Sequence, residues 1–271
     1  MPNELWRRTV DAMTMPFEFS VVLDADSPDA GVLDDTIDAI LGDLVWADDT
    51  FSLWRDDTPM SRVSRGELAV DEAPPAIGEV LAACDRYREA TGGAFDARKP
   101  DGSLDPTGIV KTWAVERARW RLDQIGARDW MIGASGDVIV SGSAPGGKPW
   151  RLGIADPRRS EDPSAGPVLD VVDLGGDNRA LCSSGTAQHG QHLWNPSSGE
   201  MAAAYVQVSV VGDDLVDCDA WATAIAVGGE DVLRAAAKHG LEALAIRAAA
   251  NGEPVSAQAT AGWPSVPVPE R

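Results

Sequence analysis

The spacing of apolar residues at the start of the chain predicts a strand followed by a helix. Phe17, Phe19, Val21 and Leu23 alternate with other residues, as on a strand with one face in a core. After Ser27, which is expected to cap a helix, apolar residues recur at helical spacing: Leu33, Ile37, Ile40, Leu41 and Leu44. A polar loop, 55–59, follows the segment Phe51–Trp54. The pattern therefore indicates a half-buried strand and an amphipathic helix in succession.

Two further helices are expected in the first half of the chain. Pro75, a favourable first-turn residue, begins a helix that ends at Gly92-Gly93. Its buried stripe is expected to consist of Leu81, Cys84 and Tyr87. The next helix begins near Ile109 and ends by Gly126.

Short apolar runs, separated by clusters of Gly, Pro, Asp and Ser, predict strands in the second half. They are Trp130–Ile132, Val138–Val140, Trp150–Ile154, Val168–Leu174 and Ala204–Val211. Asp219 is expected to open a short helix that stops at Gly228-Gly229, and Glu230–His239 to form another. Asn251-Gly252 lies between two apolar-rich runs and is typical of a hairpin turn.

Helices and strands are mixed along the chain without regular βαβ alternation. This order predicts the α+β class, with mixed or antiparallel sheets and packed helices. No low-complexity linker divides the chain, so residues 1–271 are expected to form a single domain, with two subdomains as the open alternative. The proline-rich tail, 262–271, is expected to be flexible or draped on the surface.

The charge of the chain restricts its partners. It has 43 acidic and 23 basic residues, a net charge of −20, which opposes binding to nucleic acid or to an anionic membrane. No apolar stretch is long enough for a membrane anchor and the N-terminal segment has no signal-peptide pattern, so a cytoplasmic location is expected. The three cysteines lack metal-site spacing and are expected to be reduced core thiols. Any phosphate-binding site must be a local exception to the acidity.

The segment Asp105–Lys111 is the first candidate for such an exception. Pro106 and Gly108 precede Lys111, which falls in the first turns of the predicted helix. A lysine near a helix N-terminus is electrostatically unfavourable unless an anion such as a pyrophosphate lies between them. A surface lysine is the alternative interpretation.

Three other segments have weaker signals. Thr91–Asp96 combines two glycines, an aromatic residue and a carboxylate, which suit an adenine or ribose, although for this motif alone a helix C-cap explains the glycines better. Asp219 and Thr223 are four residues apart, so that in a helix their oxygens share one face and suit Mg²⁺; an N-cap aspartate is the alternative. His189 and His192 lie in a polar, turn-rich stretch and are candidate acid/base groups.

Taken in order, these motifs resemble the FAD:protein FMN transferase (ApbE) family over nearly the whole chain. The matching segments are Met13–Met15, Phe51–Trp54, Gly93–Asp96, Asp105–Lys111 with Trp113-Ala114, Ala134–Asp137, Ser184-Gly185, His192–Gly199, and Asp219 with Thr223. The resemblance implies an α+β fold with the architecture of that family, which is similar to the T-fold. Each motif alone is unspecific, whereas the ordered set is a strong signal.

The resemblance also implies roles for individual residues. Family members bind FAD through positions that match Met13, Trp54, Ala94, Phe95, Asp96, Asp105, Lys111 and Leu193. They hold Mg²⁺ through positions that match Asp219 and Thr223, with the backbone oxygens of Gly108 and Ala222 as further candidates. The implied reaction is attack by a Thr or Ser hydroxyl of an acceptor flavoprotein on the FMN-side phosphorus of FAD, with AMP as the leaving group. Lys111 and His192 are the expected catalytic residues.

Four departures from the family pattern qualify the expected activity. Thr112 stands where the pattern has Gly and is expected to add bulk beside the cofactor. Asn195 replaces Asp, Thr14 replaces Gly, and Ala134-Ser135 stands where the pattern has Gly-Gly. Binding of FAD and metal is expected to survive these changes. An FAD pyrophosphatase that releases FMN and AMP, and a non-catalytic FAD-binding protein, are the alternatives to a transferase.

Overall fold

The computed structural model describes residues 4–157, 167–185, 193–196, 199, 204–247 and 256–267. Its helices are α1 (Ala30–Phe51), α2 (Pro59–Ser64), α3 (Pro75–Ala90), α4 (Thr107–Gln124), α5 (Leu215–Gly228) and α6 (Glu230–Lys238). Its strands are β1 (Glu4–Ala12), β2 (Met15–Leu23), β3 (Trp130–Ala134), β4 (Asp137–Ser141), β5 (Trp150–Ala155), β6 (Val168–Leu174), β7 (Ala180–Gly185), β8 (Gln207–Gly212), β9 (Glu242–Ile246), β10 (Ala257–Ala259) and β11 (Ser265–Val266).

One large sheet organises these elements. Its eight strands have the order β1-β2-β3-β4-β7-β8-β9-β10, and each described pairing is antiparallel. The chain leaves this sheet after β4 to form β5 and β6, which pair with β11 in a second sheet of three strands. The predicted α+β class with antiparallel sheets and packed helices is confirmed.

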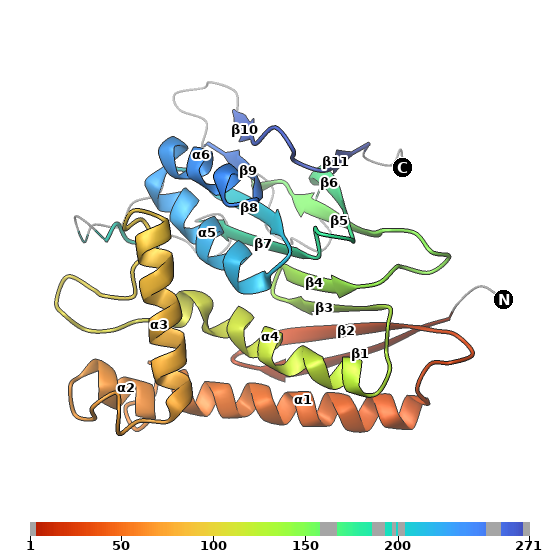
Figure 1. Ribbon diagram of the computed structural model, residues 1–271, viewed down its shortest axis with the longest axis horizontal. Helices are drawn as coiled ribbons and strands as arrows, with labels where there is room; N and C mark the ends of the chain where they lie inside the picture. The colour runs from red at the N-terminus through yellow and green to blue at the C-terminus, as the bar shows by residue number, and fades with distance from the viewer. Residues whose placement is uncertain are drawn as a thin grey trace.

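Helices cover one face of the large sheet, with α1, α4 and α5 side by side in front of the strands (Figure 1). The main core lies in this layer and includes Phe17 and Phe19 of β2, Leu33 and Ile37 of α1, and Ile109 of α4. These side chains are at most 1% exposed. Because burial of apolar area is the main favourable term in folding, this layer fixes the positions of α4 and α5.

The opposite face of the large sheet packs against the small sheet. Trp150, Ile154, Val172 and Leu174 of the small sheet form a second core with Val211 and neighbouring side chains of the large one. Alternate residues of a strand point to opposite faces, so β7 and β8 supply side chains to both cores. The side chain of Gln207 in β8 also donates a hydrogen bond to the backbone oxygen of Ala155 in β5 at 3.1 Å, which joins the two sheets beside this core.

Most of the predicted elements are present. β2, α3, α4, α6 and the five predicted strands occur at or within a few residues of the expected positions. Two helix starts were wrong. Ser27 does not cap α1, because its hydroxyl closes a turn with Asp24 and the N-cap position is Asp29. Asp219 does not open α5, because Asp214 caps that helix by accepting hydrogen bonds from the N–H groups of Val216 and Asp217.

The C-terminal tail was expected to be flexible or draped on the surface. Within its described part, 262–267, the indole N–H of Trp263 donates to Asp170 at 2.7 Å and the Ser265 hydroxyl donates to the same carboxylate at 2.6 Å. Ser265 and Val266 then pair with β6. Asn251 and Gly252 lie outside the described residues, although β9 and β10 on either side pair antiparallel. None of the described helices is both long and apolar enough to cross a bilayer.

The three cysteines are buried free thiols, as expected. Burial raises the pKa of Cys84 to about 12, and it raises the pKa values of Cys182 and Cys218 well above that of an ordinary thiol. Since the thiolate is the reactive species, we predict that a chromogenic disulfide reagent at pH 8 labels none of the three in the native protein within minutes. All three should be labelled in denaturant, and rapid native labelling of one thiol would contradict the fold around it.

Candidate functional site

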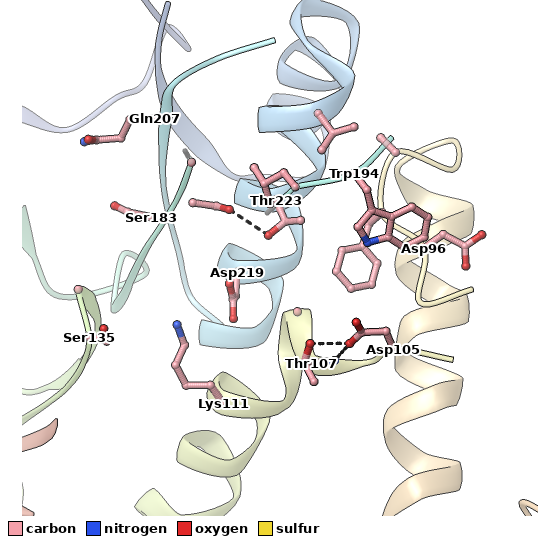
Figure 2. A pocket seen from close by; sticks show the side chains of 18 of the residues that line it. Asp96, Asp105, Thr107, Lys111, Ser135, Ser183, Trp194, Gln207, Asp219 and Thr223 are labelled. Atoms are coloured by element: carbon pink, nitrogen blue, oxygen red, sulfur yellow. Dashed lines mark hydrogen bonds between the residues drawn. The ribbon is translucent and has the colours of Figure 1, made fainter. Parts of the chain in front are cut away.

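A cavity of about 1400 Å³ lies where the helix layer, the β3–β4 turn and the small sheet meet. Its walls include the N-terminal part of α4, one face of α5, the ends of β5 and β7, and the segment 94–101. Figure 2 shows carboxylates, hydroxyls and one lysine from these elements pointing toward the cavity. The volume exceeds the range of roughly 300–1,000 Å³ usual for small-ligand pockets. The cavity therefore suits an extended ligand such as a dinucleotide.

The N-terminus of α4 forms one wall. Asp105 accepts hydrogen bonds from the backbone N–H of Thr107 at 3.1 Å and from the Thr107 hydroxyl at 2.5 Å, and it pairs with Lys99 Nζ at 2.7 Å. Burial alone would raise the pKa of Asp105, but these hydrogen bonds lower it below its ordinary value. Gly108 lets this end of the helix approach the ring of Phe95, which a Cβ would meet at 3.2 Å. An anion is thus already present at this helix terminus.

Lys111 lies one turn further along α4 and reaches β4. Its Nζ is 2.5 Å from Oδ2 of Asp137, whose carboxylate is 1% exposed and whose Oδ1 accepts the backbone N–H of Ser183 at 3.0 Å. Burial alone would lower the pKa of Lys111, but the charges of Asp137 and Asp219 outweigh it and raise the pKa above its ordinary value. Lys111 is therefore a permanent cation in the cavity wall. The anion beside it in the structure is a carboxylate of the protein.

Asp219 and Thr223 lie one turn apart on α5, and both line the cavity. Asp219 is 7% exposed, and its Oδ2 accepts a hydrogen bond from the hydroxyl of Thr112 at 2.9 Å. Burial and the charge of Asp137 raise the pKa of Asp219 above its ordinary value, against the opposing effects of Lys111 and Thr112. Thr223 Oγ1 is 3.2 Å from the hydroxyl of Ser184. In Figure 2 the Asp219 side chain points toward the amino group of Lys111.

Two tight turns complete the wall opposite α5. Ser135 and Gly136 connect β3 to β4 with φ of 52° and 96°, and Met13 and Thr14 connect β1 to β2 with φ of 50° and 62°. Two-residue hairpin turns of this kind need positive φ at both central positions. Asp137 is the first residue after its turn, so the turn sets the position of its carboxylate.

Comparison with known proteins identifies the family. The sequence model of the ApbE family matches residues 97–245, more than half of the chain. The chain belongs to the ApbE family. The family resemblance inferred from the ordered motifs is therefore confirmed.

Curated relatives and solved structures agree with this assignment. The FAD:protein FMN transferase of Rhodobacter capsulatus is 30% identical over 179 residues, which are 62% of this chain and 33% of the relative. That of Haemophilus influenzae is 24% identical over 56% of this chain and 46% of the relative. This chain thus spans about a third to a half of these curated proteins.

The solved structures establish the fold. The flavin transferase ApbE from Vibrio cholerae has a TM-score of 0.79 at 18% identity, with 97% of this chain and 99% of that chain covered. The apo flavinyl transferase ApbE of Pseudomonas stutzeri has a TM-score of 0.78 at 21% identity, with 96% of each chain covered. The expected ApbE architecture is confirmed along nearly the full length of the chain.

The ApbE fold brings most of the predicted site residues to one cavity. Those that line it are Trp54, Ala94, Phe95, Asp96, Asp105, Gly108, Lys111, Leu193, Asp219 and Thr223. Two do not: Met13 packs against the main core, with Thr14 and Met15 in the cavity wall, and Ala222 is fully buried inside α5. His192 lies outside the described residues. The roles assigned to all these residues stay predictions.

Two residues at the site differ from what the sequence suggested. Thr112 does not add bulk beside the cavity, because it is fully buried and faces Asp219. Asp137 was noted only as part of a motif, although it is the partner of Lys111. A carboxylate directly after Ser135-Gly136, in the short segment between two predicted strands, was the signal that could have indicated it. Its pairing with a helix residue follows only from the tertiary structure.

The donor set suits a hard divalent cation that keeps several waters. Among the described residues no cluster of three His, Cys, Asp or Glu side chains has metal-site geometry. A carboxylate and a hydroxyl on one helix face, with Gly108 nearby in the same wall, match Mg²⁺, which binds through one or two carboxylates and retains water. Lys111, Asp137 and Asp219 together carry an excess negative charge when ionised, which a divalent cation would neutralise.

The ion pair between Lys111 and Asp137 generates a prediction about stability. Lys111→Met leaves a buried carboxylate without its cation, so we expect the free energy of unfolding to fall by about 3–5 kcal/mol. The double variant Lys111→Met/Asp137→Asn should lose clearly less than the sum of the single changes. Urea denaturation measures both.

The matched control is Lys238→Met, which removes an exposed lysine from α6 and should change stability by about 0.5 kcal/mol or less. If the losses in the free energy of unfolding at 111 and 137 simply add in the double variant, the two residues do not interact in solution.

Proposed function

We propose that this ApbE-family chain transfers the FMN moiety of FAD to a Thr or Ser hydroxyl of an acceptor flavoprotein in a Mg²⁺-dependent reaction. The relatives that it matches are named FAD:protein FMN transferases. The observation that supports the proposal best is the charged cluster of Lys111 and Asp219, in the wall of a dinucleotide-sized cavity, with Asp137 buried behind Lys111. Such a cluster is suited to a pyrophosphate and a divalent cation together.

The aromatic residues around the cavity suit the two ring systems of FAD. Trp54 is 97% exposed at the cavity rim, an unusual state for an indole that has no ligand to stack on. Phe95 and Trp194 line the same cavity, and Asp96 and Asp105 provide carboxylates that can accept hydrogen bonds from ribose or adenine. These side chains would bind and orient FAD with its pyrophosphate near Lys111.

Asp219, Thr223 and the backbone oxygen of Gly108 would hold Mg²⁺. Ala222 is a weaker candidate, because it does not line the cavity. A bound Mg²⁺ would neutralise pyrophosphate oxygens and the charge that develops on the leaving AMP. The protein supplies the rest: Lys111 stays protonated because of its two carboxylate neighbours, and it contributes a fixed positive charge beside the reacting phosphorus.

The proposed reaction is a displacement at the FMN-side phosphorus. A new P–O bond forms to the acceptor hydroxyl oxygen, the hydroxyl proton passes to a base, and the P–O bond to AMP breaks with both electrons on AMP. His192 is the proposed acid/base residue. The Asp219 carboxylate is buried and hydrogen-bonded, so it would keep its position during the reaction. The metal that it holds would then keep the phosphates in place.

The decisive assay incubates the purified protein with FAD and Mg²⁺, with and without a threonine-bearing acceptor domain. We expect covalent flavin on the acceptor and one AMP per flavin transferred, measured by in-gel flavin fluorescence and chromatography. FMN plus AMP without acceptor would identify a pyrophosphatase. FAD that binds and stays intact in both reactions would leave a non-catalytic FAD-binding protein.

Replacement of the proposed metal ligand is a separate prediction. Asp219→Ala should lower metal-dependent turnover by at least about 10²-fold, because the loss removes the charged ligand. Asp231→Ala removes an exposed carboxylate from α6 and should leave turnover unchanged. Initial rates across a Mg²⁺ titration measure the effect. Equal rates for the two variants would contradict the assignment of Asp219.

A further inference from the structure

Thr112 is the buried residue that joins the two helices of the site. It is fully buried between α4 and α5, and its Oγ1 lies 2.9 Å from Oδ2 of Asp219 and 3.0 Å from the backbone oxygen of Ile109. A hydroxyl has one proton to donate. An ionised carboxylate is the stronger acceptor, so the proton goes to Asp219 when that group is charged.

Two consecutive residues of α4 each contact a different carboxylate. Lys111 points to Asp137 of β4, and Thr112 points to Asp219 of α5, because consecutive residues of a helix are rotated by about 100°. One oxygen of Asp219 is thereby fixed by a partner that lies behind the cavity wall. Without this hydroxyl, that oxygen would face a protein interior where an unpaired polar atom is costly.

The hydrogen bond from Thr112 fixes the Asp219 carboxylate from the side away from the cavity. Asp219 lines the cavity, whereas Thr112 does not, so the hydrogen bond holds the side chain from behind. A carboxylate fixed in one rotamer binds a cation without the entropic cost of being ordered. Groups that orient a ligand in this way contribute to metal affinity although they never touch the metal.

We propose that Thr112 is a positioning residue that orients the Asp219 carboxylate for a divalent cation through its hydroxyl hydrogen bond. The proposal rests on the proposed function, because it takes Asp219 to be the metal ligand. Thr112 does not line the cavity, so it would contact neither FAD nor the reacting atoms. Its role is confined to the affinity for the metal and to the steps that need the metal.

Two matched pairs of side chains isolate the hydroxyl from the packing. Thr and Val have the same shape, and Ser and Ala both lack the γ-methyl group, so each pair differs mainly in the hydroxyl. The experiment compares the full chain with Thr112→Val, Thr112→Ser and Thr112→Ala. Free Mn²⁺ is measured by electron paramagnetic resonance during a Mn²⁺ titration in the presence of FAD, and FAD affinity is measured separately in EDTA by flavin fluorescence.

We expect loss of the hydroxyl to weaken Mn²⁺ binding by about 10–100-fold in both pairs, Thr against Val and Ser against Ala. FAD affinity in EDTA should differ little within each pair. A residue that only packs would change both affinities according to side-chain volume, with Ser and Ala alike. If Thr112→Val does not fold, as judged by thermal unfolding, the Ser and Ala pair still decides the question.

Equal Mn²⁺ affinity within a pair would overturn the role of Thr112. If the wild-type chain binds Mn²⁺ and transfers FMN in that case, the proposed function stands and only the positioning role fails. A wild-type chain that binds no Mn²⁺ in the presence of FAD would overturn the proposed metal site together with the role of Thr112. The two failures are therefore distinguishable.

Discussion

The electrostatic interaction of Lys111 with two buried carboxylates is the constraint on which the rest of the site depends. Each charged group comes from a different element, Lys111 from α4, Asp137 from β4 and Asp219 from α5. A carboxylate that is removed from water needs a cation or several hydrogen bonds, since its desolvation costs several kcal/mol even after relaxation. Asp137 obtains Lys111 and the N–H of Ser183, and Asp219 obtains Thr112.

The hydrogen bond from Ser183 to Asp137 depends on the order of the strands in the large sheet. β4 and β7 are neighbours in the sheet only because the chain leaves it after β4 to form the small sheet and returns. That excursion places Ser183 beside Asp137 and at the same time supplies β5 as a wall of the cavity. The same connection thus satisfies a buried charge and shapes the space for a ligand.

Local patterns made much of the fold predictable. Pro75 and Gly92-Gly93 indicated the two ends of α3, because proline and glycine affect the backbone at their own positions. β6 was predicted with its observed limits. β1 was missed because Arg7, Arg8 and Asp11 break its apolar pattern on an edge strand, where polar residues are tolerated.

The site itself was only partly predictable. Ordered motifs indicated Lys111 and Asp219, but the hydrogen bond from Thr112 joins residues 107 positions apart, and no spacing rule reaches that far. The helix geometry that turns Thr112 away from the cavity also corrects the expectation of added bulk there. The departures Thr14 and Ser135 lie at positive φ, where Gly is the least strained residue and other residues cost roughly 1–2 kcal/mol. The turns are retained nevertheless, because the pairings on either side fix them.

The electrostatics of the cavity also explain how an acidic protein would accept an anionic dinucleotide. The chain has a net charge of −20, and both lysines that line the cavity are already paired, Lys99 with Asp105 and Lys111 with Asp137. Among the described residues that line the cavity there is thus no unpaired cation to receive a pyrophosphate. In the proposed function a divalent cation would bring further positive charge with the ligand, and the carboxylate of Asp219 would retain it. In the proposed function, metal and dinucleotide binding would be coupled for this physical reason, since each would bring the charge that the other needs.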